Sequence, residues 1–462
     1  MDNKKQHIAI FTTASIPWLT GTAVNPLFRA AYLAKDGERK VTLVVPWLPL
    51  KDQQHLFPNN ITFSNPSEQQ NYALQWVEER TGFKSNFRML FYPAKFYVEK
   101  RSILGLGDIT VVIPDDEADI AVLEEPEHLT WYHHGKRWKS KFRLVIGIVH
   151  TNYREIVKRE RNALAAFFLK YINTWVVNIY CHRVIRLSAA TQDLPRSIVC
   201  NVHGVNPRFL EIGEKKKWQQ QNDNQTSTRG AYYIGKMLWS KGYGELLKLL
   251  TDHQNNLAGT KIYLYGSGED SDRVQVAAKK LELAIQVHPG QDHSHPIFND
   301  YKVLLNPSTT DVVCTATAEA IAMGKIVVCA NHPSNEFFMQ FPNCWTYNDG
   351  EGFVTATLKA LSEQPAPLTD KQRHELSWDA ATARFLQAAQ LDNNVPKQKQ
   401  PKTSSKPFLS KSISLHSRLE SASAFVHYIG TGLLYSPPNE EQCRELGLPV
   451  PSKKWRLLPS AR

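Results

Sequence analysis

The 462-residue sequence predicts an α/β protein made of two doubly wound, Rossmann-like domains that face a central cleft. Short apolar runs rich in β-branched residues alternate with helical patterns in the first half of the chain. A polar stretch interrupts this alternation, and the alternation then resumes. Uniformly apolar strands that alternate with helices are typical of a parallel sheet covered by helices on both faces. A chain of this length is also long enough for two or three domains.

The first half contains four runs that we expect to be buried strands and two segments with helical character. The strands are predicted at residues 7–14, 40–46, 118–126 and 143–150, and the helices at residues 23–36 and 162–180. Residues 213–230 (GEKKKWQQQNDNQTSTRG) are polar and rich in Gln and Asn. We interpret them as a linker or an exposed loop between the two halves.

The second half repeats the pattern of the first. The strands are predicted at residues 230–235, 261–266, 301–307 and 325–330, and the helices at residues 243–254, 271–283 and 315–323. An amphipathic helix at 376–390 and a basic tether rich in Pro, Ser and Lys at 396–412 follow. The predicted parts are a Rossmann-like domain, a second such domain, a terminal helix that packs back on the first domain, and a tail, at residues 1–205, 206–375, 376–391 and 392–462.

The composition restricts the class of partner. Lys and Arg number 55 and Asp and Glu number 44, so the formal net charge is +11. A basic balance favours anionic partners such as nucleic acid, phosphate-bearing substrates or an anionic membrane surface, and it does not choose among them. Six cysteines occur without a C-x-x-C pair, which favours reduced thiols over a disulfide framework or a zinc site.

We expect neither a cleaved targeting segment nor a membrane span. The first residues run directly into a strand pattern, without the apolar core of a signal peptide. The most apolar stretch, residues 163–181, contains Lys170 and two Asn. Spans contain few or no charges, so this stretch is interpreted as a helix of the folded protein.

Two carboxylates follow a predicted strand in STTDVVCTATAEAIAMGK, residues 308–325. Asp311 lies in a loop near the start of a short helix, Glu319 lies one or two turns into that helix, and Gly324 is placed to end it. No His or third carboxylate accompanies the pair, so it does not form a metal site by itself. The spacing fits hydrogen bonds to sugar and ribose hydroxyls with a phosphate at the helix N-terminus between them. A capped surface helix with a solvated Glu would show the same pattern.

Two lysines follow the first strand of the second half. Lys236 comes directly after Gly235, and Lys241 lies five residues on, so the two lysines flank the start of a helix. Two cations at a helix N-terminus suit a diphosphate. Ordinary surface lysines remain the alternative.

Three further strand ends carry candidate residues. Gly266 and Gly268 form a turn after the next strand, without the third glycine of a dinucleotide fingerprint. Gly21 and Thr22 lie before the first helix, where a glycine lets the backbone approach a ligand closely. His150 ends an apolar strand, as an active-site group or as a structural residue.

In this order, these motifs resemble the retaining glycosyltransferases of the GT-B fold, family 4, over roughly residues 7 to 390. That family typically has Glu at the position of Asp311, Arg at that of Lys236 and a second glycine at that of Thr22. These departures narrow the choice within the family. The segments FYPAKFYVEKRSILGLGDI and EEPEHLTWYHHG resemble those of the plant enzymes that add a galactose to monogalactosyldiacylglycerol. The chain begins at the catalytic domain, as in the shorter form of those enzymes.

The resemblance implies transfer of galactose from UDP-galactose to monogalactosyldiacylglycerol, with retention at the anomeric carbon. The second domain would bind the donor, and the first would face the acceptor. The implied place is the cytosolic face of the chloroplast outer envelope, with the enzyme attached peripherally and without a nucleic-acid partner.

The resemblance also implies roles for the site residues. Lys236 and Lys241 would neutralise the leaving diphosphate, and Asp311 would contact the galactosyl hydroxyls. Glu319 would contact the ribose, and His150 would reach the sugar from the opposite domain. Five further residues would line the donor site: Gly21, Thr22, Gly235, Gly266 and Gly268.

We expect front-face transfer, in which the leaving phosphate helps to deprotonate the acceptor, because no second carboxylate is placed as a nucleophile. No obligatory metal or other cofactor is expected, because no D-x-D motif lies in a suitable loop.

Docking to a membrane is predicted through the first domain. Residues 87–105 interleave aromatic and basic side chains, a pattern that suits the headgroup region of an anionic bilayer. Residues 153–171 offer a second basic and then apolar stretch, and ordinary core helices with solvated ends are the alternative for both. The candidate membrane or acceptor residues are Arg88, Phe91, Tyr92, Lys95, Phe96, Lys100 and Arg101.

Three other functions stay open at this point. A GT-B glycosyltransferase with a water-soluble acceptor would not need a membrane, and a GT-B sugar-nucleotide epimerase would convert a UDP-sugar without an acceptor. A non-catalytic nucleic-acid binder is suggested by the charge alone, and it would bind with a steep salt dependence.

Overall fold

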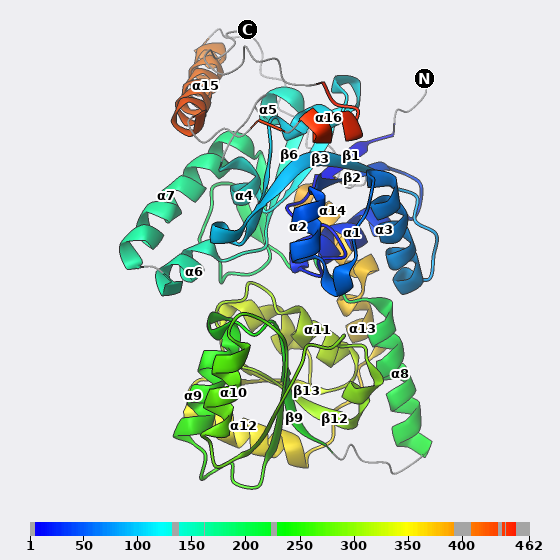
Figure 1. The fold of residues 1–462 in the computed structure, drawn as a ribbon, viewed down its shortest axis with the longest axis vertical. Helices are drawn as coiled ribbons and strands as arrows, with labels where there is room; N and C mark the ends of the chain where they lie inside the picture. Colours follow the sequence, from blue (N-terminus) through cyan, green and yellow to red (C-terminus); the bar gives the residue numbers. More distant parts are fainter. Residues whose placement is uncertain are drawn as a thin grey trace.

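The computed structural model describes residues 5–131, 138–160, 162–222, 229–391, 408–432, 437–438 and 440–449. Two sheets with helices on both faces form two domains, one above the other in Figure 1. The predicted α/β class with two doubly wound domains is therefore confirmed. The boundary predicted at residue 205 falls between the last strand of the first sheet and the helix that follows it.

The N-terminal sheet has eight strands in the order β4-β3-β2-β1-β5-β6-β7-β8. All neighbours pair in parallel except β3 and β4, which form an antiparallel pair. The strands are β1 (His7–Phe11), β2 (Lys40–Trp47), β3 (Arg88–Tyr97), β4 (Ser102–Gly105), β5 (Ile120–Glu124), β6 (Leu144–Val149), β7 (Arg183–Arg186) and β8 (Ser197–Val199).

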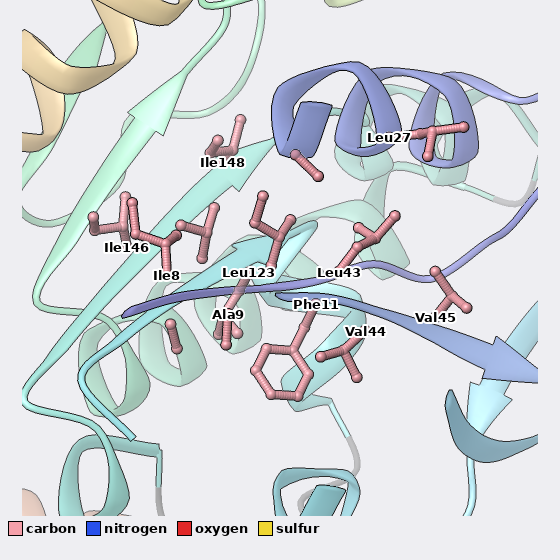
Figure 2. Packing of buried hydrophobic residues seen from close by; sticks show 14 of the residues in the cluster. Ile8, Ala9, Phe11, Leu27, Leu43, Val44, Val45, Leu123, Ile146 and Ile148 are labelled. Atoms are coloured by element: carbon pink, nitrogen blue, oxygen red, sulfur yellow. The ribbon is translucent and has the colours of Figure 1, made fainter. Parts of the chain in front are cut away.

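The core of this domain lies between the sheet and its helices. All residues of β1 are buried, and Figure 2 shows Ile8 and Phe11 among side chains of β2, β5, β6 and α1. The helices are α1 (Gly21–Leu33), α2 (Leu50–Leu56), α3 (Pro66–Thr81), α4 (Pro126–Thr130), α5 (Trp138–Lys141), α6 (Tyr153–Glu160) and α7 (Ala163–Tyr180).

The C-terminal domain is built on a six-stranded parallel sheet in the order β11-β10-β9-β12-β13-β14. The strands are β9 (Arg229–Ile234), β10 (Lys261–Tyr265), β11 (Ala284–His288), β12 (Tyr301–Asn306), β13 (Ile326–Ala330) and β14 (Cys344–Tyr347). The helices are α8 (Pro207–Asn222), α9 (Gly244–Asp252), α10 (Ser271–Lys279), α11 (Thr315–Ala322), α12 (Gly350–Ser362) and α13 (Asp370–Leu376).

The prediction of a linker or exposed loop is wrong for residues 213–222, which belong to α8. This helix packs against α11 and α3, so it bridges the two domains on one side. Gly213 lies so close to α11 that a Cβ atom there would come within 2.1 Å of the Ala322 oxygen. The residues from 223 to 228 lie outside the described part of the chain.

The chain returns to the N-terminal domain after α13. Helix α14 (Trp378–Ala389) packs on α1, and its Trp378 ring stacks on Phe28 with the ring centroids 5.5 Å apart. The chain therefore crosses between the domains twice, near Val205 and near Ser377. These two residues form an isolated parallel β-bridge.

Part of the predicted tail is ordered on the N-terminal domain as well. Helix α15 (Phe408–Gly432) packs against α7, where His427 Nδ1 lies 2.9 Å from the Tyr180 hydroxyl. Helix α16 (Glu440–Glu445) lies near β3 (Figure 1), and Glu445 accepts a hydrogen bond of 2.6 Å from Trp47 Nε1. The predicted tether at 396–412 lies outside the described residues up to 407, and α15 begins at Phe408.

Within the described ranges, no helix is long and apolar enough to cross a membrane.

Candidate active site

Direct contacts join the residues that follow the strands of the two sheets. Ser188, just after β7, donates its hydroxyl to the backbone oxygen of Val312, which follows β12. Arg159 of α6 donates from Nη2 to Thr309 Oγ1 at 2.8 Å, and its Nη1 pairs with Glu245 of α9. Open α/β sheets bind their ligands at the carboxyl ends of the strands, so the candidate site lies where these two edges meet.

The predicted lysine and carboxylate motifs come together on the C-terminal side of this site. Lys241 Nζ lies 3.4 Å from Asp311 Oδ1, and the two side chains are 39% and 23% exposed. Their loops are tied by a hydrogen bond of 2.9 Å from Thr310 Oγ1 to the Ser240 oxygen. Both charged groups therefore remain accessible to a ligand while their backbones are held.

Lys236 is exposed on the loop directly after β9. Its ammonium group makes no hydrogen bond or ion pair with any residue in the described ranges, so it is available to an anion. The loop that carries it is fixed by backbone bonds from Gly235 to Tyr265 and from Met237 to Ser267, at 3.1 and 3.0 Å.

Glu319 is held by a pair of buried residues that the sequence did not indicate. His293 Nδ1 lies 2.7 Å from Glu319 Oε2, and His293 Nε2 lies 2.7 Å from the Tyr232 hydroxyl. His293 lies in the loop after β11, and Tyr232 lies on β9. His293 thus orients one carboxylate oxygen of Glu319, and the other oxygen accepts no hydrogen bond from the described residues.

The helix that carries Glu319 begins without a side-chain cap. Cys314 precedes α11, and its side chain accepts no capping hydrogen bond from the first-turn amides. Helix α9, after Lys241, likewise begins without a side-chain cap. The first amides of a helix and its dipole favour an anion, so both starts are suited to a phosphate.

The glycines of the two loops have different roles. A Cβ at Gly266 would lie 2.2 Å from the Gly235 oxygen, and one at Gly268 would lie 2.4 Å from the Met237 oxygen. These two glycines are required because the turn packs on the loop of Lys236. A Cβ at Gly21 would meet only the Asn25 side chain, at 3.6 Å, so no internal contact requires glycine at this exposed position.

Thr22, the other predicted residue of the first loop, lies in the first turn of α1. Its backbone oxygen accepts the Thr12 hydroxyl, and its own hydroxyl lies 3.2 Å from that of Thr20. Helix α1 also begins without a side-chain cap.

His150 follows β6, and its side chain is only 5% exposed. Its Nε2 is hydrogen-bonded to Glu124, which ends β5 and is itself paired with Arg29 of α1. The sequence did not single out Glu124 or Arg29. The signal for Glu124 was its position, because it ends a strand that neighbours the His150 strand.

The predicted membrane or acceptor residues at 88–101 lie in a β-hairpin, since β3 and β4 pair in antiparallel. Three of the aromatic residues are buried, so the expectation that they face lipid is wrong for Phe91, Tyr92 and Phe96. The Tyr92 hydroxyl donates to the Thr12 oxygen at 2.8 Å. Consecutive side chains of a strand point to opposite faces, and residues 91–94 are all buried, so both faces of β3 are covered by the protein here.

The basic residues of the hairpin are exposed, and two of them have acidic partners. Arg88 pairs with Glu117 at 2.6 Å, and Arg101 pairs with Glu269 of the C-terminal domain at 2.7 Å. Lys95 and Lys100 lie near the ring of Tyr97, with Nζ 5.6 and 5.5 Å from its centroid. Arg101 thus lies at the domain interface.

The second stretch predicted for docking, residues 153–171, has an exposed apolar face. Five side chains on successive turns of α7 are between 44% and 65% exposed: Leu164, Phe167, Phe168, Tyr171 and Ile172. Their spacing places them on one stripe of the helix. Exposed Arg154 and Lys158 of α6 and Lys170 of α7 supply positive charge nearby.

Among the described residues, no group of three or more His, Cys, Asp or Glu side chains is arranged to hold a metal ion.

Comparison with protein families finds a match over residues 214–339 to the family described as glycosyl transferases group 1. The matched region contains Lys236, Lys241, Asp311 and Glu319 and ends after β13.

Two curated relatives match almost the whole chain. "Digalactosyldiacylglycerol synthase 2, chloroplastic" from Glycine max is 65% identical over 98% of this chain and 100% of its own length. The protein of the same name from Arabidopsis thaliana is 63% identical over 97% of each chain.

A solved structure shares the fold at low identity. Sucrose-phosphate synthase from Thermosynechococcus elongatus aligns with a TM-score of 0.52 and 12% identity, over 84% of this chain and 99% of its own. Such neighbours are GT-B glycosyltransferases, so the two facing domains have the GT-B fold.

Proposed function

Because this chain belongs to the digalactosyldiacylglycerol synthase family of glycosyltransferases, we propose that it moves galactose from UDP-galactose onto monogalactosyldiacylglycerol, with retention at the anomeric carbon. The name of the relatives states the product, a lipid with two galactose units. The observation that supports this choice most strongly is the identity of 65% over nearly the full chain, together with cations and uncapped helix starts at the candidate donor site.

The donor would lie on the C-terminal side. Its diphosphate would meet Lys236, Lys241 and the first amides of α11, because these positive groups follow the neighbouring strands β9 and β12 and both lysines are accessible. Asp311 would contact the galactosyl hydroxyls, and the free oxygen of Glu319 would contact the ribose.

Catalysis would consist mainly of stabilising the leaving UDP. Charge develops on the phosphate oxygen as the sugar bond breaks, and fixed cations facing that oxygen lower the barrier. His150 would contact the sugar from the N-terminal domain. Transfer would occur on the front face, with the leaving phosphate taking the acceptor proton, and without an obligatory metal or other cofactor.

The lipid acceptor requires docking at a bilayer, and we place the docking surface on α6 and α7. The apolar stripe of α7, defined by Leu164, Phe167, Phe168, Tyr171 and Ile172, is exposed on the N-terminal domain. An amphipathic helix with basic neighbours binds in the headgroup region through apolar burial and attraction to anionic lipid. This placement replaces the aromatic face of β3, which is buried.

The compartment follows from the relatives, which are named chloroplastic. We propose the outer envelope and its cytosolic face for this chain, with peripheral attachment through the α7 stripe.

Incubation of the purified protein with UDP-galactose and monogalactosyldiacylglycerol in mixed micelles, followed by lipid separation, tests the reaction. Digalactosyldiacylglycerol with both linkages assigned by NMR is the expected product. Transfer to a water-soluble galactoside at equal efficiency would support the alternative soluble transferase. Conversion of UDP-galactose without acceptor would support an epimerase.

Docking is tested by sedimentation with liposomes that contain monogalactosyldiacylglycerol and phosphatidylglycerol. The double substitution Phe167→Ser and Phe168→Ser should abolish cosedimentation and activity on bilayers, while activity in micelles is retained. Val276→Ser is the matched control, since Val276 is 55% exposed on the C-terminal domain. Loss of binding on charge reversal at Arg88, Lys95 and Lys100, with the α7 variant still bound, would place docking on the β3–β4 hairpin instead.

A further inference from the structure

His150 is held on one side by a buried carboxylate. Its Nε2 is hydrogen-bonded to Glu124 Oε2, while Glu124 Oε1 accepts a hydrogen bond of 2.7 Å from Arg29 Nε. The Arg29 and Glu124 side chains are fully buried, and that of His150 is 5% exposed. The three residues come from α1, β5 and the end of β6, so tertiary packing brings them together.

The pair of Arg29 and Glu124 keeps the carboxylate ionised inside the domain. Burial alone would raise the pKa of the Glu124 carboxyl, but the charge of Arg29 and the hydrogen bonds from Arg29 and His150 hold it below its usual value. An ionised carboxylate only accepts hydrogen bonds. The hydrogen on the bond to His150 therefore belongs to Nε2.

This arrangement determines what His150 can offer to a substrate. When the ring carries one proton, the bond to Glu124 places it on Nε2 and leaves the lone pair on Nδ1, and this atom makes no hydrogen bond to the residues that the structure describes. An imidazole whose tautomer and orientation are set by a carboxylate behind it is a common arrangement at reacting centres. Nδ1 can then accept a hydrogen bond from a sugar hydroxyl.

Arg29 is itself fixed by groups at the connection between the domains. Its Nη1 donates to the Val202 oxygen at 3.0 Å, and its guanidinium lies over the rings of Trp378 and Phe385 of α14 at 5.8 and 5.1 Å. Val202 precedes the first crossing of the chain between domains, and α14 follows the second. The carboxylate behind His150 is thus anchored to both connecting segments.

We infer that Glu124 is a positioning residue for the transfer reaction: held by Arg29, it fixes the tautomer and direction of His150 so that Nδ1 faces the sugar being transferred. This role rests on the proposed galactosyl transfer, which supplies the rate to be measured. It adds to that proposal a residue that touches neither substrate.

A double-mutant cycle on Glu124 and His150 tests the inference. Glu124→Gln should lower kcat by about 10- to 100-fold, the range typical of groups that orient a histidine from behind, with the KM for UDP-galactose changed less than about twofold. If Glu124 acts through His150, the double variant Glu124→Gln with His150→Gln has the same kcat as His150→Gln alone. Losses that multiply in the double variant, or a wild-type kcat for Glu124→Gln, would overturn the inference.

Removal of one partner of a buried ion pair can prevent folding, so a second variant is needed. Arg29→Met combined with Glu124→Gln removes both buried charges and leaves His150 without its carboxylate. Folding is checked by circular dichroism and melting temperature. A folded double variant with wild-type kcat contradicts the positioning role, and one with the low kcat of Glu124→Gln supports it.

Glu127→Gln is the matched control, since Glu127 is also a fully buried carboxyl of the same segment and makes no contact with His150. It should leave kcat unchanged. In the wild type, ¹⁵N shifts of labelled histidine should show His150 as the Nε2-protonated tautomer, with the signal identified by its loss in His150→Gln. A wild type without transferase activity would refute the proposed function, whereas an active wild type with an Nδ1-protonated His150 would refute only this inference.

Discussion

The two domains carry their charged residues in opposite ways at the edges where they meet. On the N-terminal side the ion pair of Arg29 and Glu124 is fully buried. On the C-terminal side Lys241 and Asp311 keep 39% and 23% of their side chains exposed, and Lys236 is exposed as well.

This difference matches two tasks. Buried charges are expensive unless they are paired, and once paired they hold one geometry, which suits groups that orient a substrate. Charges that stay hydrated can exchange water for the oxygens of an anionic ligand at little cost. The N-terminal edge is therefore preorganised by the protein, and the C-terminal edge would be completed by the proposed donor.

The largest effect should come from the accessible lysines of the C-terminal edge. Lys241→Ala should lower kcat by about 100-fold or more, because it removes one of the two cations proposed to face the leaving phosphate. Steady-state kinetics with UDP-galactose measures it. Lys248→Ala is the control on the neighbouring helix, where Lys248 is 75% exposed and pairs with Asp252. An equal effect of both substitutions would mean that Lys241 acts only through surface charge.

The buried side is probed by the pH dependence of stability. Burial, the main cause, and the nearby Glu125 raise the pKa of Glu127 from 4.5 to about 8. An acid with a raised pKa in the folded state stabilises the protein below the unfolded pKa, and this contribution is lost as the pH rises from 4.5 to about 8.

Glu127→Gln should remove this loss of stability with rising pH. At pH 8 the variant should melt a few degrees above the wild type, since each pH unit of the slope corresponds to about 1.4 kcal/mol. Near pH 4.5 the two proteins should melt together. Scanning calorimetry across this range measures the difference, and a constant offset at every pH would contradict the buried-acid explanation.

A smaller effect is expected at Glu319, which is held by the buried His293. Glu319→Gln should raise the KM for UDP-galactose by about 10-fold, the loss of one charge-assisted hydrogen bond to the ribose. His293→Ala should reproduce most of that rise, because it releases the Glu319 oxygen held at 2.7 Å. Isothermal titration with UDP separates this binding effect from catalysis. If UDP binds His293→Ala as tightly as the wild type, the orientation of Glu319 does not matter.

The smallest effect is expected at Gly21. Its added Cβ would touch only Asn25, so Gly21→Ala should leave the melting temperature within about 1 °C of the wild type and raise the donor KM a few-fold, through closer contact with the ligand. Gly266→Ala is the contrast, since its Cβ would lie 2.2 Å from a backbone oxygen and the fold itself should be weakened. Melting curves and donor KM for both variants make the comparison.

Eight of the parallel strands could be predicted because each is a short, largely buried run of apolar residues. Five others were not predicted: β3, β7, β8, β11 and β14. The closeness of Asp311 and Lys241 could be predicted because each follows such a strand, and parallel strands end at one edge. These signals are local in the sequence.

Other features depend on contacts between distant residues. Glu124 is paired with Arg29, 95 positions away, and His293 with Glu319, 26 positions away, so neither is visible as a motif. The Gln- and Asn-rich end of α8 looked like a linker because composition does not report that Gly213 fits against α11. The aromatics of β3 are interleaved with basic residues, and this composition suits a strand that is partly buried in the core as well as it suits a membrane surface.

The return of α14, α15 and α16 to the N-terminal domain has a consequence for biosynthesis. Domains generally fold in the order in which they leave the ribosome, the N-terminal one first. Here the first sheet emerges early, yet three of its contacts can form only after the whole C-terminal sheet has been synthesised. They join Trp378 to Phe28, His427 to Tyr180 and Glu445 to Trp47. The second domain to be synthesised is thus the first that can be completed, and the first domain must wait, with its α1 and α7 faces uncovered, until the end of translation.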